Sequence, residues 1–202
     1  MNTSKTIANI LSYVLSPTVF AFYIILIFLL FPPLNNSENI FVSLTLAIIF
    51  LCIFPIVMIL YFKRKGTVDI WVSNQNQRLP FYLIAIIGYI LGSIIFYIRG
   101  ETTLFVLSIA YVGVTSAVTI SNFSTKVSSH SAGVAGPLLA VTLVYGILAL
   151  PSFLLLPLVF WSRLKLNAHS FTQLTLGAII GIIVTFCVFV LLYPPSLISI
   201  IS

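Results

Sequence analysis

Two histidines, His130 and His169, each lie in a polar segment just before a long apolar run. Imidazole is the side chain that most often acts as a nucleophile or general acid–base at neutral pH, and guanidinium forks bind phosphate oxygens in pairs. The two segments also contain Lys126, Ser128, Ser129, Arg163 and Gln173. This combination of imidazoles, cations and hydroxyls predicts chemistry on an anion, with phosphate favoured.

A third polar segment, from Asp69 to Pro80, adds Arg78 to these groups. Ser128 or Ser129 is placed to cap the helix that His130 opens, and Asn167 to cap the helix that His169 opens. Helix N-termini present unpaired N–H groups and the positive end of the helix dipole. We therefore expect two helix N-termini and three cations to form one anion pocket.

The elements that must position these residues are apolar. The chain has 202 residues, of which nine are basic, three are acidic and 60% are hydrophobic, with a mean hydropathy of +1.22. A soluble domain typically has about a quarter of its residues charged. This composition excludes a water-exposed globular domain, a disordered chain, a nucleic-acid-binding protein and a secreted disulfide scaffold. It predicts a polytopic protein of the membrane bilayer.

Apolar runs mark the expected membrane segments, since a bilayer needs roughly 20 apolar residues per helix. A shorter run at about 150–162 contains Pro151 and Pro157 and is expected to span or to be re-entrant. The longer runs lie at about 8–31, 40–62, 81–98, 103–120, 131–149 and 169–193. We expect one all-α domain, residues 1–202, with six or seven crossings.

The charges are unevenly distributed over the expected topology. Seven crossings place the N-terminus and the loops at 63–80, 121–130 and 162–168 on one face, with eight of the nine basic residues. The other face receives Arg99, Glu38 and Glu101. By the positive-inside rule the basic face, which also carries the histidines, is predicted to be cytoplasmic.

The polar segments resemble the signatures of the type 2 phosphatidic acid phosphatase (PAP2) superfamily. The family motifs are Lys-x6-Arg-Pro, Pro-Ser-Gly-His and Ser-Arg-x5-His-x3-Asp. Here the corresponding residues, in the same order, are Arg78-x-Pro80, then Lys126-x-Ser128-x-His130, then Ser162-Arg163-x5-His169-x3-Gln173. The resemblance covers about residues 69–173 and is most similar to a divergent branch of small archaeal and bacterial members.

Several positions depart from the family pattern. Trp71 stands where the first motif has its lysine, and Leu79 separates Arg78 from the proline. Val127 replaces the proline of the second motif and Ser129 its glycine. Gln173 replaces the final aspartate, while Lys126 is expected to take the place of the missing lysine.

The resemblance implies a metal-independent phosphatase without a cofactor, acting on a lipid phosphate. His169 would form a phosphohistidine, and His130 would protonate the leaving alkoxide and then activate water. The expected phosphate-binding residues are Arg78, Lys126, Ser128, Ser129 and Arg163. Gln173 lies four residues after His169, so it can accept a hydrogen bond from the imidazole, but it cannot offer an imidazolium a full negative charge.

Other functions fit parts of the same pattern. A catalytically weakened lipid-phosphate binder or transporter would use the same pocket. A membrane b-type cytochrome would use His130 and His169 as axial ligands, although such ligands usually face each other from within helices. A purely structural membrane protein would have these residues only as interfacial anchors. The candidate lipids are phosphatidate, phosphatidylglycerophosphate-type lipids and polyprenyl mono- or diphosphates.

Overall fold

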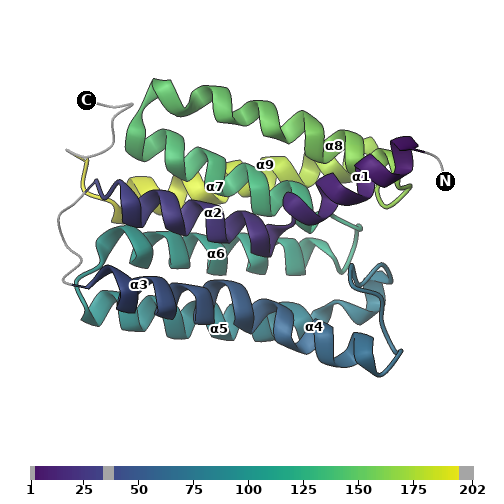
Figure 1. Ribbon diagram of the computed structural model, residues 1–202, viewed down its shortest axis with the longest axis horizontal. Helices are drawn as coiled ribbons and strands as arrows, with labels where there is room; N and C mark the ends of the chain where they lie inside the picture. Colours follow the sequence, from purple (N-terminus) through teal and green to yellow (C-terminus); the bar gives the residue numbers. More distant parts are fainter. Residues whose placement is uncertain (1–2, 34–38, 196–202) are drawn as a thin grey trace.

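The computed structural model describes residues 3–33 and 39–195, and Glu38 therefore lies outside the described residues. Every element in the described ranges is a helix, as expected (Figure 1). The elements are α1 (Thr3–Val14), α2 (Pro17–Leu30), α3 (Ile40–Ala47), η1 (Ile48–Ile53), α4 (Phe54–Arg64), η2 (Gln75–Gln77), α5 (Leu79–Ile98), α6 (Thr102–Ser121), α7 (Ser129–Tyr145), η3 (Ile147–Leu154), α8 (Leu155–Lys165) and α9 (Phe171–Leu192).

Five stretches of the described chain are long and apolar enough to cross a membrane, as in a multi-pass membrane protein. They are Ile40–Arg64, Leu79–Ile98, Thr102–Ser121, Ile147–Lys165 and Phe171–Leu192. A sixth is formed if α1 and α2, which are bent by 51° at their junction, count as one broken span. The structure thus supports five or six crossings, so the prediction of six or seven agrees with it only at six. The run at 150–162 lies within one of the five, and α7, with 17 residues, is not among them.

Proline shapes two of the apolar segments. Pro17 begins α2, where its missing N–H costs no helical hydrogen bond, and the chain bends there. Pro55 follows the π-helical turn η1, which joins α3 to α4. A proline inside a helix removes one backbone hydrogen bond, and π turns, although rare, occur mostly as single turns inside α-helices. The bend at Pro17 matters for the site because α2 begins directly against α7: a Cβ on Gly133 would lie 2.8 Å from the Cβ of Pro17.

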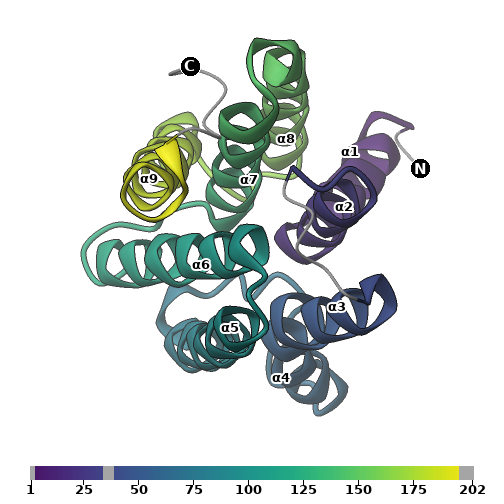
Figure 2. The same cartoon turned by 90° about the vertical axis from the view of Figure 1, so that its left-hand side faces the viewer.

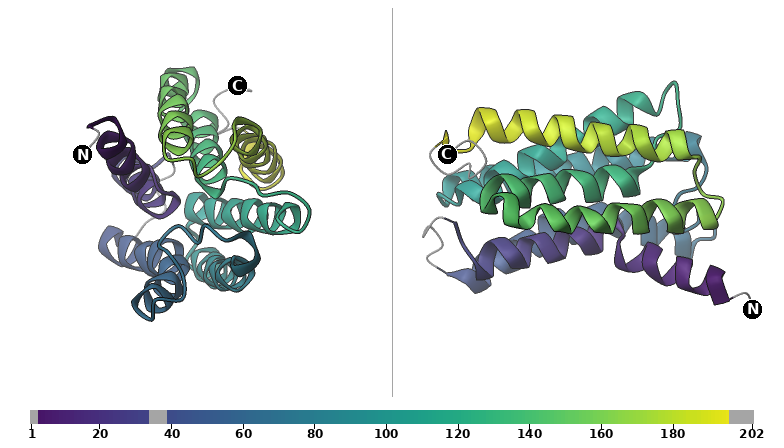
Figure 3. Two further views of the ribbon diagram at one scale, coloured as in Figure 1. Left: turned by 90° about the vertical axis from the view of Figure 1, so that its right-hand side faces the viewer. Right: turned by 90° about the horizontal axis from the view of Figure 1, so that it is seen from above.

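Helix α7 runs through the middle of the bundle and packs most closely on α9 (Figures 2 and 3). Glycines on α9 permit this approach, because a Cβ on Gly177 would collide with the carbonyl of Ser128 and one on Gly181 with the carbonyl of Ala132. The N–H of Ser128 donates to the carbonyl of Gln173 at 3.1 Å. Close packing therefore brings the N-termini of α7 and α9 side by side.

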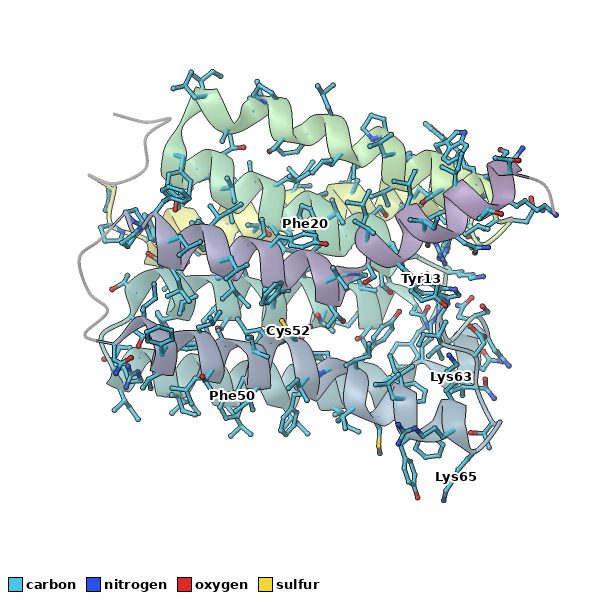
Figure 4. All side chains as sticks on the ribbon, in the orientation of Figure 1. Tyr13, Phe20, Phe50, Cys52, Lys63 and Lys65 are labelled. Atoms are coloured by element: carbon cyan, nitrogen blue, oxygen red, sulfur yellow. The ribbon has the colours of Figure 1, made fainter. Side chains whose placement is uncertain are left out.

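The two ends of the bundle differ in charge. The N-terminus of α1, the C-termini of α4 and α8 and the N-terminus of α5 meet at one end, on the right in Figure 1, and with them the eight basic residues predicted to share a face. Lys63 and Lys65 are labelled there in Figure 4. At the other end Nε of Arg99 lies 2.6 Å from Oε1 of Glu101, which also accepts from the Ser43 hydroxyl at 2.8 Å.

Candidate anion-binding site

A cavity of about 260 Å³ reaches the charged residues at the basic end of the bundle. Five of the eight residues predicted for the site line it: Arg78, Ser129, His130, Arg163 and His169. They come from the loop before α5, the start of α7, the end of α8 and the loop before α9. Side chains separated by up to 91 positions in the sequence thus meet around one space, as the three polar segments predicted.

The rest of the cavity wall is mainly apolar and extends into the bundle. It includes Val19, Ile56, Ile59, Ala85, Val114 and Val118, from α2, α4, α5 and α6. The inner part reaches Tyr89 and Tyr111, whose stacked rings are 5.3 Å apart. Tyr89 lies about three helical turns, roughly 16 Å, beyond Arg78 along α5. The cavity therefore has a cationic end, lined by Arg78, Arg163, His130 and His169 and here termed the mouth, and an apolar interior.

Both arginines are fixed by neutral acceptors. Arg78 is 5% exposed, and it donates from Nε to the Val72 carbonyl at 2.9 Å and from Nη1 to the Val127 carbonyl at 3.2 Å. Arg163 is 2% exposed and donates from Nη1 to the Ser12 hydroxyl at 2.6 Å, while its Nε has no hydrogen-bond partner among the described residues. Each guanidinium is held in place but retains donors for a ligand.

Within the described residues, these cations have no carboxylate ion pair. In residues 3–33 and 39–195 the ion pair present is Arg99–Glu101, at the opposite end. The carboxylate of Asp69, the acidic group nearest the site, accepts instead from the backbone of Trp71 and Ser73. Buried charge without a counter-charge costs several kcal/mol. The site is thus electrostatically suited to an anion.

His169 is held by Gln173 and kept neutral by its surroundings. Its Nδ1 lies 3.2 Å from Oε1 of Gln173, as the spacing of four residues predicted. Burial, together with the charges of Arg163 and Arg78, lowers the pKa of His169 to about 3. Since the amide oxygen is an acceptor, Nδ1 carries the proton, and Nε2 is left as a free nucleophilic lone pair.

His130 contacts α1 and an aromatic ring in the loop before α5. It is 7% exposed, it makes a hydrogen bond with the backbone of Ser12, and its ring meets that of Trp71 edge-on at 5.1 Å. Its Nε2 is buried and has no partner among the described residues. A buried polar atom without a partner, on the wall of a cavity, is an atom that a ligand can satisfy.

The helix caps agree with the sequence at one histidine and differ at the other. Ser128 caps α7 by accepting from the Ser131 N–H at 3.3 Å, as predicted. The prediction that Asn167 caps the helix opened by His169 is wrong, because α9 begins at Phe171 and Ser170 is its cap. Ser170 and Gln173 form a capping box, which is the stronger start signal. His169 therefore lies in the loop, one residue before the cap.

Three predicted residues lie behind the cavity wall and not on it. Ser128 uses its hydroxyl as the cap of α7, and Gln173 holds His169. Lys126 donates from Nζ to the carbonyl of Ala168 at 3.1 Å, so it fastens the loop that carries His169. Burial, together with the charges of Arg78 and Arg163, lowers the pKa of Lys126.

Three residues of the site were not predicted from the sequence. Trp71 contacts both His130 and Arg163, Ser12 holds Arg163, and the Tyr82 hydroxyl lies 2.7 Å from that of Ser129. Ser12 lies on the buried side of the amphipathic helix α1, where a polar side chain usually has a hydrogen-bond partner. Trp71 stands where the first PAP2 motif has a lysine, and this difference from the motif was the signal in the sequence that could have pointed to Trp71.

Comparison with models of protein families, with curated proteins and with solved structures finds no match to this chain.

Proposed function

We propose that the protein is a membrane lipid-phosphate phosphatase that acts through a phosphohistidine, as its motifs resemble those of the PAP2 superfamily. The observation that carries the proposal is the cavity mouth, where two histidines and two arginines meet without a carboxylate ion pair in the described chain. Arginines bind phosphate oxygens, and a neutral histidine with a free Nε2 can attack phosphorus. The pairing of these groups in one cavity favours phosphoryl transfer over binding alone.

In the first step of the proposed reaction, Nε2 of His169 attacks phosphorus. An N–P bond forms as the P–O bond to the lipid breaks, and His130, which the bound phosphate anion stabilises as an imidazolium, gives its Nε2 proton to the departing alkoxide. Arg78 and Arg163 stabilise the charge on the remaining phosphoryl oxygens. Gln173 keeps the Nδ1 proton of His169 in place, so that Nε2 stays the nucleophile.

In the second step, water replaces histidine on phosphorus. His130 takes a proton from the attacking water, the N–P bond breaks, and inorganic phosphate leaves with His169 restored. The loss of a proton in the first step prepares His130 to accept one in the second. The unpartnered Nε2 of His130 is the atom that we assign to both proton transfers.

A lipid substrate is favoured by the shape of the cavity. The apolar part of the cavity is lined by α2 on one side and by α4 on the other. These sides belong to different packed pairs of helices, because α1, which precedes α2, packs on α8, whereas α4 packs on α5. A phosphate at the mouth leaves room for the start of an apolar chain toward Tyr89. We propose that the basic end, and with it the site, faces the cytoplasm, because eight of nine basic residues gather there.

The test is phosphate release by the purified protein from a panel of phosphatidate, a phosphatidylglycerophosphate-type lipid, and a polyprenyl mono- and diphosphate. We expect release from at least one lipid, and a loss of at least about 10³-fold in His169→Ala. Lys165→Ala is the matched control, since it removes a cation at the same end that does not line the cavity. Equal rates in wild type and His169→Ala would contradict the proposal.

A second candidate is a lipid-phosphate binding or transport protein without catalysis. Gln173 favours it, because a neutral amide stabilises an imidazolium less than a carboxylate does. Binding of phosphate that is lost in Arg78→Met and Arg163→Met, without release of phosphate from any lipid, would support this candidate and exclude the phosphatase.

A further inference from the structure

The ring of Trp71 connects three helices at the mouth of the cavity. Its centroid lies 4.6 Å from the ring of Tyr13 in α1 and 5.1 Å from the ring of His130 in α7. The guanidinium carbon of Arg163, in α8, lies 5.1 Å from the same ring, within the range of a cation–π contact. One indole thus touches both a proposed proton donor and a proposed phosphate ligand.

The turn that carries Trp71 is built around one carboxylate. Asp69 accepts from the Trp71 N–H at 2.8 Å, from the Ser73 N–H at 2.9 Å and from the Ser73 hydroxyl at 3.1 Å. Although burial raises the pKa of Asp69, the hydrogen bonds from Ser73 and Trp71 hold it below its ordinary value. Asp69 is therefore ionised at neutral pH and fixes the turn.

The same turn also orients Arg78. Val72 adopts a φ of 44°, a left-handed conformation that is rare for a β-branched residue. Its carbonyl accepts from Nε of Arg78 at 2.9 Å. The turn at 69–73 thus places Trp71 on Arg163 and a carbonyl on Arg78, so both arginines of the site depend on it.

Arg163 has few other contacts that could fix its plane. One nitrogen is held by Ser12, Nε has no partner in the described chain, and no carboxylate there pairs with the guanidinium. A ring beneath a guanidinium restrains its orientation and attracts its charge, and the attraction is stronger where water is excluded. Arg163 is 2% exposed, which is such an environment.

We propose that Trp71 is a positioning residue of the phosphate site: its ring holds the Arg163 guanidinium and the His130 imidazole in the arrangement that receives a phosphate anion. The identity of the ligand, phosphate, rests on the proposed function, whereas the contacts of the Trp71 ring with His130 and Arg163 do not. It predicts that an aromatic ring, and not only a side chain of similar bulk, is needed at position 71.

The ring contact is tested by fluorescence, because the chain has two tryptophans, Trp71 and Trp161. In Trp161→Phe, emission reports Trp71 alone, and Trp161 does not line the cavity. Adding Arg163→Met to that variant should change the emission, whereas adding Lys165→Met should not. Unchanged emission after Arg163→Met would overturn the inference, whether or not the protein is a phosphatase.

The positioning role is tested with inorganic phosphate by calorimetry on the detergent-solubilised full chain. Trp71→Phe keeps a ring and should bind within about three-fold of wild type, whereas Trp71→Leu should bind at least about five-fold more weakly. In turnover of the best lipid, Trp71→Leu should lower kcat as well as raise KM, because His130 also loses its contact. Equal phosphate affinity in Trp71→Leu and wild type would overturn the inference.

The outcomes separate the two proposals. Phosphate binding that depends on the ring, without release of phosphate from lipids, would leave the inference standing and contradict the phosphatase. Phosphate release that is the same in wild type and Trp71→Leu would support the phosphatase and contradict the inference. Absence of phosphate binding to the wild-type protein would contradict the inference, whereas the phosphatase is contradicted only by the absence of phosphate release from lipids that depends on His169.

Discussion

The Nδ1 atom of His169 lies 3.2 Å from Oε1 of Gln173, which also accepts from the Ser170 N–H at 3.2 Å. A single amide oxygen thus fixes the tautomer of the proposed nucleophile and completes the cap of α9. The family that the motifs resemble has aspartate at this position. The chain therefore retains the geometry of an orienting acceptor without its charge.

Restoring that charge should raise turnover. Gln173→Glu keeps the length of the side chain and suits the capping box, and it places a carboxylate beside Nδ1. We expect about a ten-fold higher kcat, because a carboxylate stabilises the imidazolium character that develops at His169. Gln173→Leu removes the acceptor and should lower kcat by at least about ten-fold. Equal kcat in all three proteins, measured by phosphate release, would contradict a role for this contact.

Acid should destabilise the protein through His169. Its pKa is about 3 in the folded chain, against roughly 6.5 for an unfolded histidine, so the unfolded state binds more protons between these values. The free energy of unfolding should fall as the pH falls from 6.5 toward 3, by roughly 2 kcal/mol at pH 4.5. Thermal unfolding at pH 7 and pH 4.5 should show a smaller loss in His169→Asn than in wild type. The same loss in both would mean that His169 is protonated without cost.

The two neighbouring serines should separate stability from binding. Ser128 caps α7, so Ser128→Ala should lower the free energy of unfolding by about 1 kcal/mol. Ser129 lines the cavity beside Tyr82, so Ser129→Ala should weaken phosphate binding by about five-fold with a smaller effect on unfolding. Denaturation curves and phosphate titrations of both variants check this. If Ser128→Ala weakened phosphate binding and Ser129→Ala lowered the free energy of unfolding, the Ser128 hydroxyl would be the one that contacts the ligand, and the prediction would be wrong.

Close packing of α7 on α9 should tolerate no added methyl group at Gly177. A Cβ there meets the Ser128 carbonyl, a backbone atom that cannot turn away. We expect Gly177→Ala to lower the free energy of unfolding by roughly 2 kcal/mol and to weaken phosphate binding, since Ser128 precedes the start of α7. Gly113→Ala is the matched control, because its Cβ meets a γ-methyl of Val184, a side-chain atom. Similar melting temperatures for both variants would contradict the argument.

Much of the fold follows from residue types that act locally. Apolar runs of bilayer length predicted the long helices. Ser128 predicted the cap of α7 because a hydroxyl just before a helix can accept a hydrogen bond from a backbone N–H of the first turn. The gathering of Arg78, His130, Arg163 and His169 was predicted from seven alternating crossings, although α7 is not among the spans that the structure supports. These inferences needed the order of segments along the chain, and no detail of packing.

The rest of the site depends on contacts between distant segments. Ser12 lies 151 residues before Arg163, to which it bonds. Trp71 reaches His130 because a left-handed Val72 turns the loop inward, and the sequence carries no signal for φ > 0 at a valine. The start of α9 was placed three residues too early because Asn167 and Ser170 are both good caps, and the capping box with Gln173 decided between them.

Under the proposed function, the charge difference between the two ends of the bundle implies a preferred leaflet. Arg99 and Glu101 neutralise each other at one end, and Arg78 and Arg163 have no such partner among the described residues at the other, roughly 30 Å away along α5. The cavity reaches Arg78 and Arg163 at the unneutralised end and extends to Tyr89 and Tyr111 inside the bundle. A phosphorylated lipid in the opposite leaflet would meet a balanced surface and would have to flip across the bilayer before it could dock.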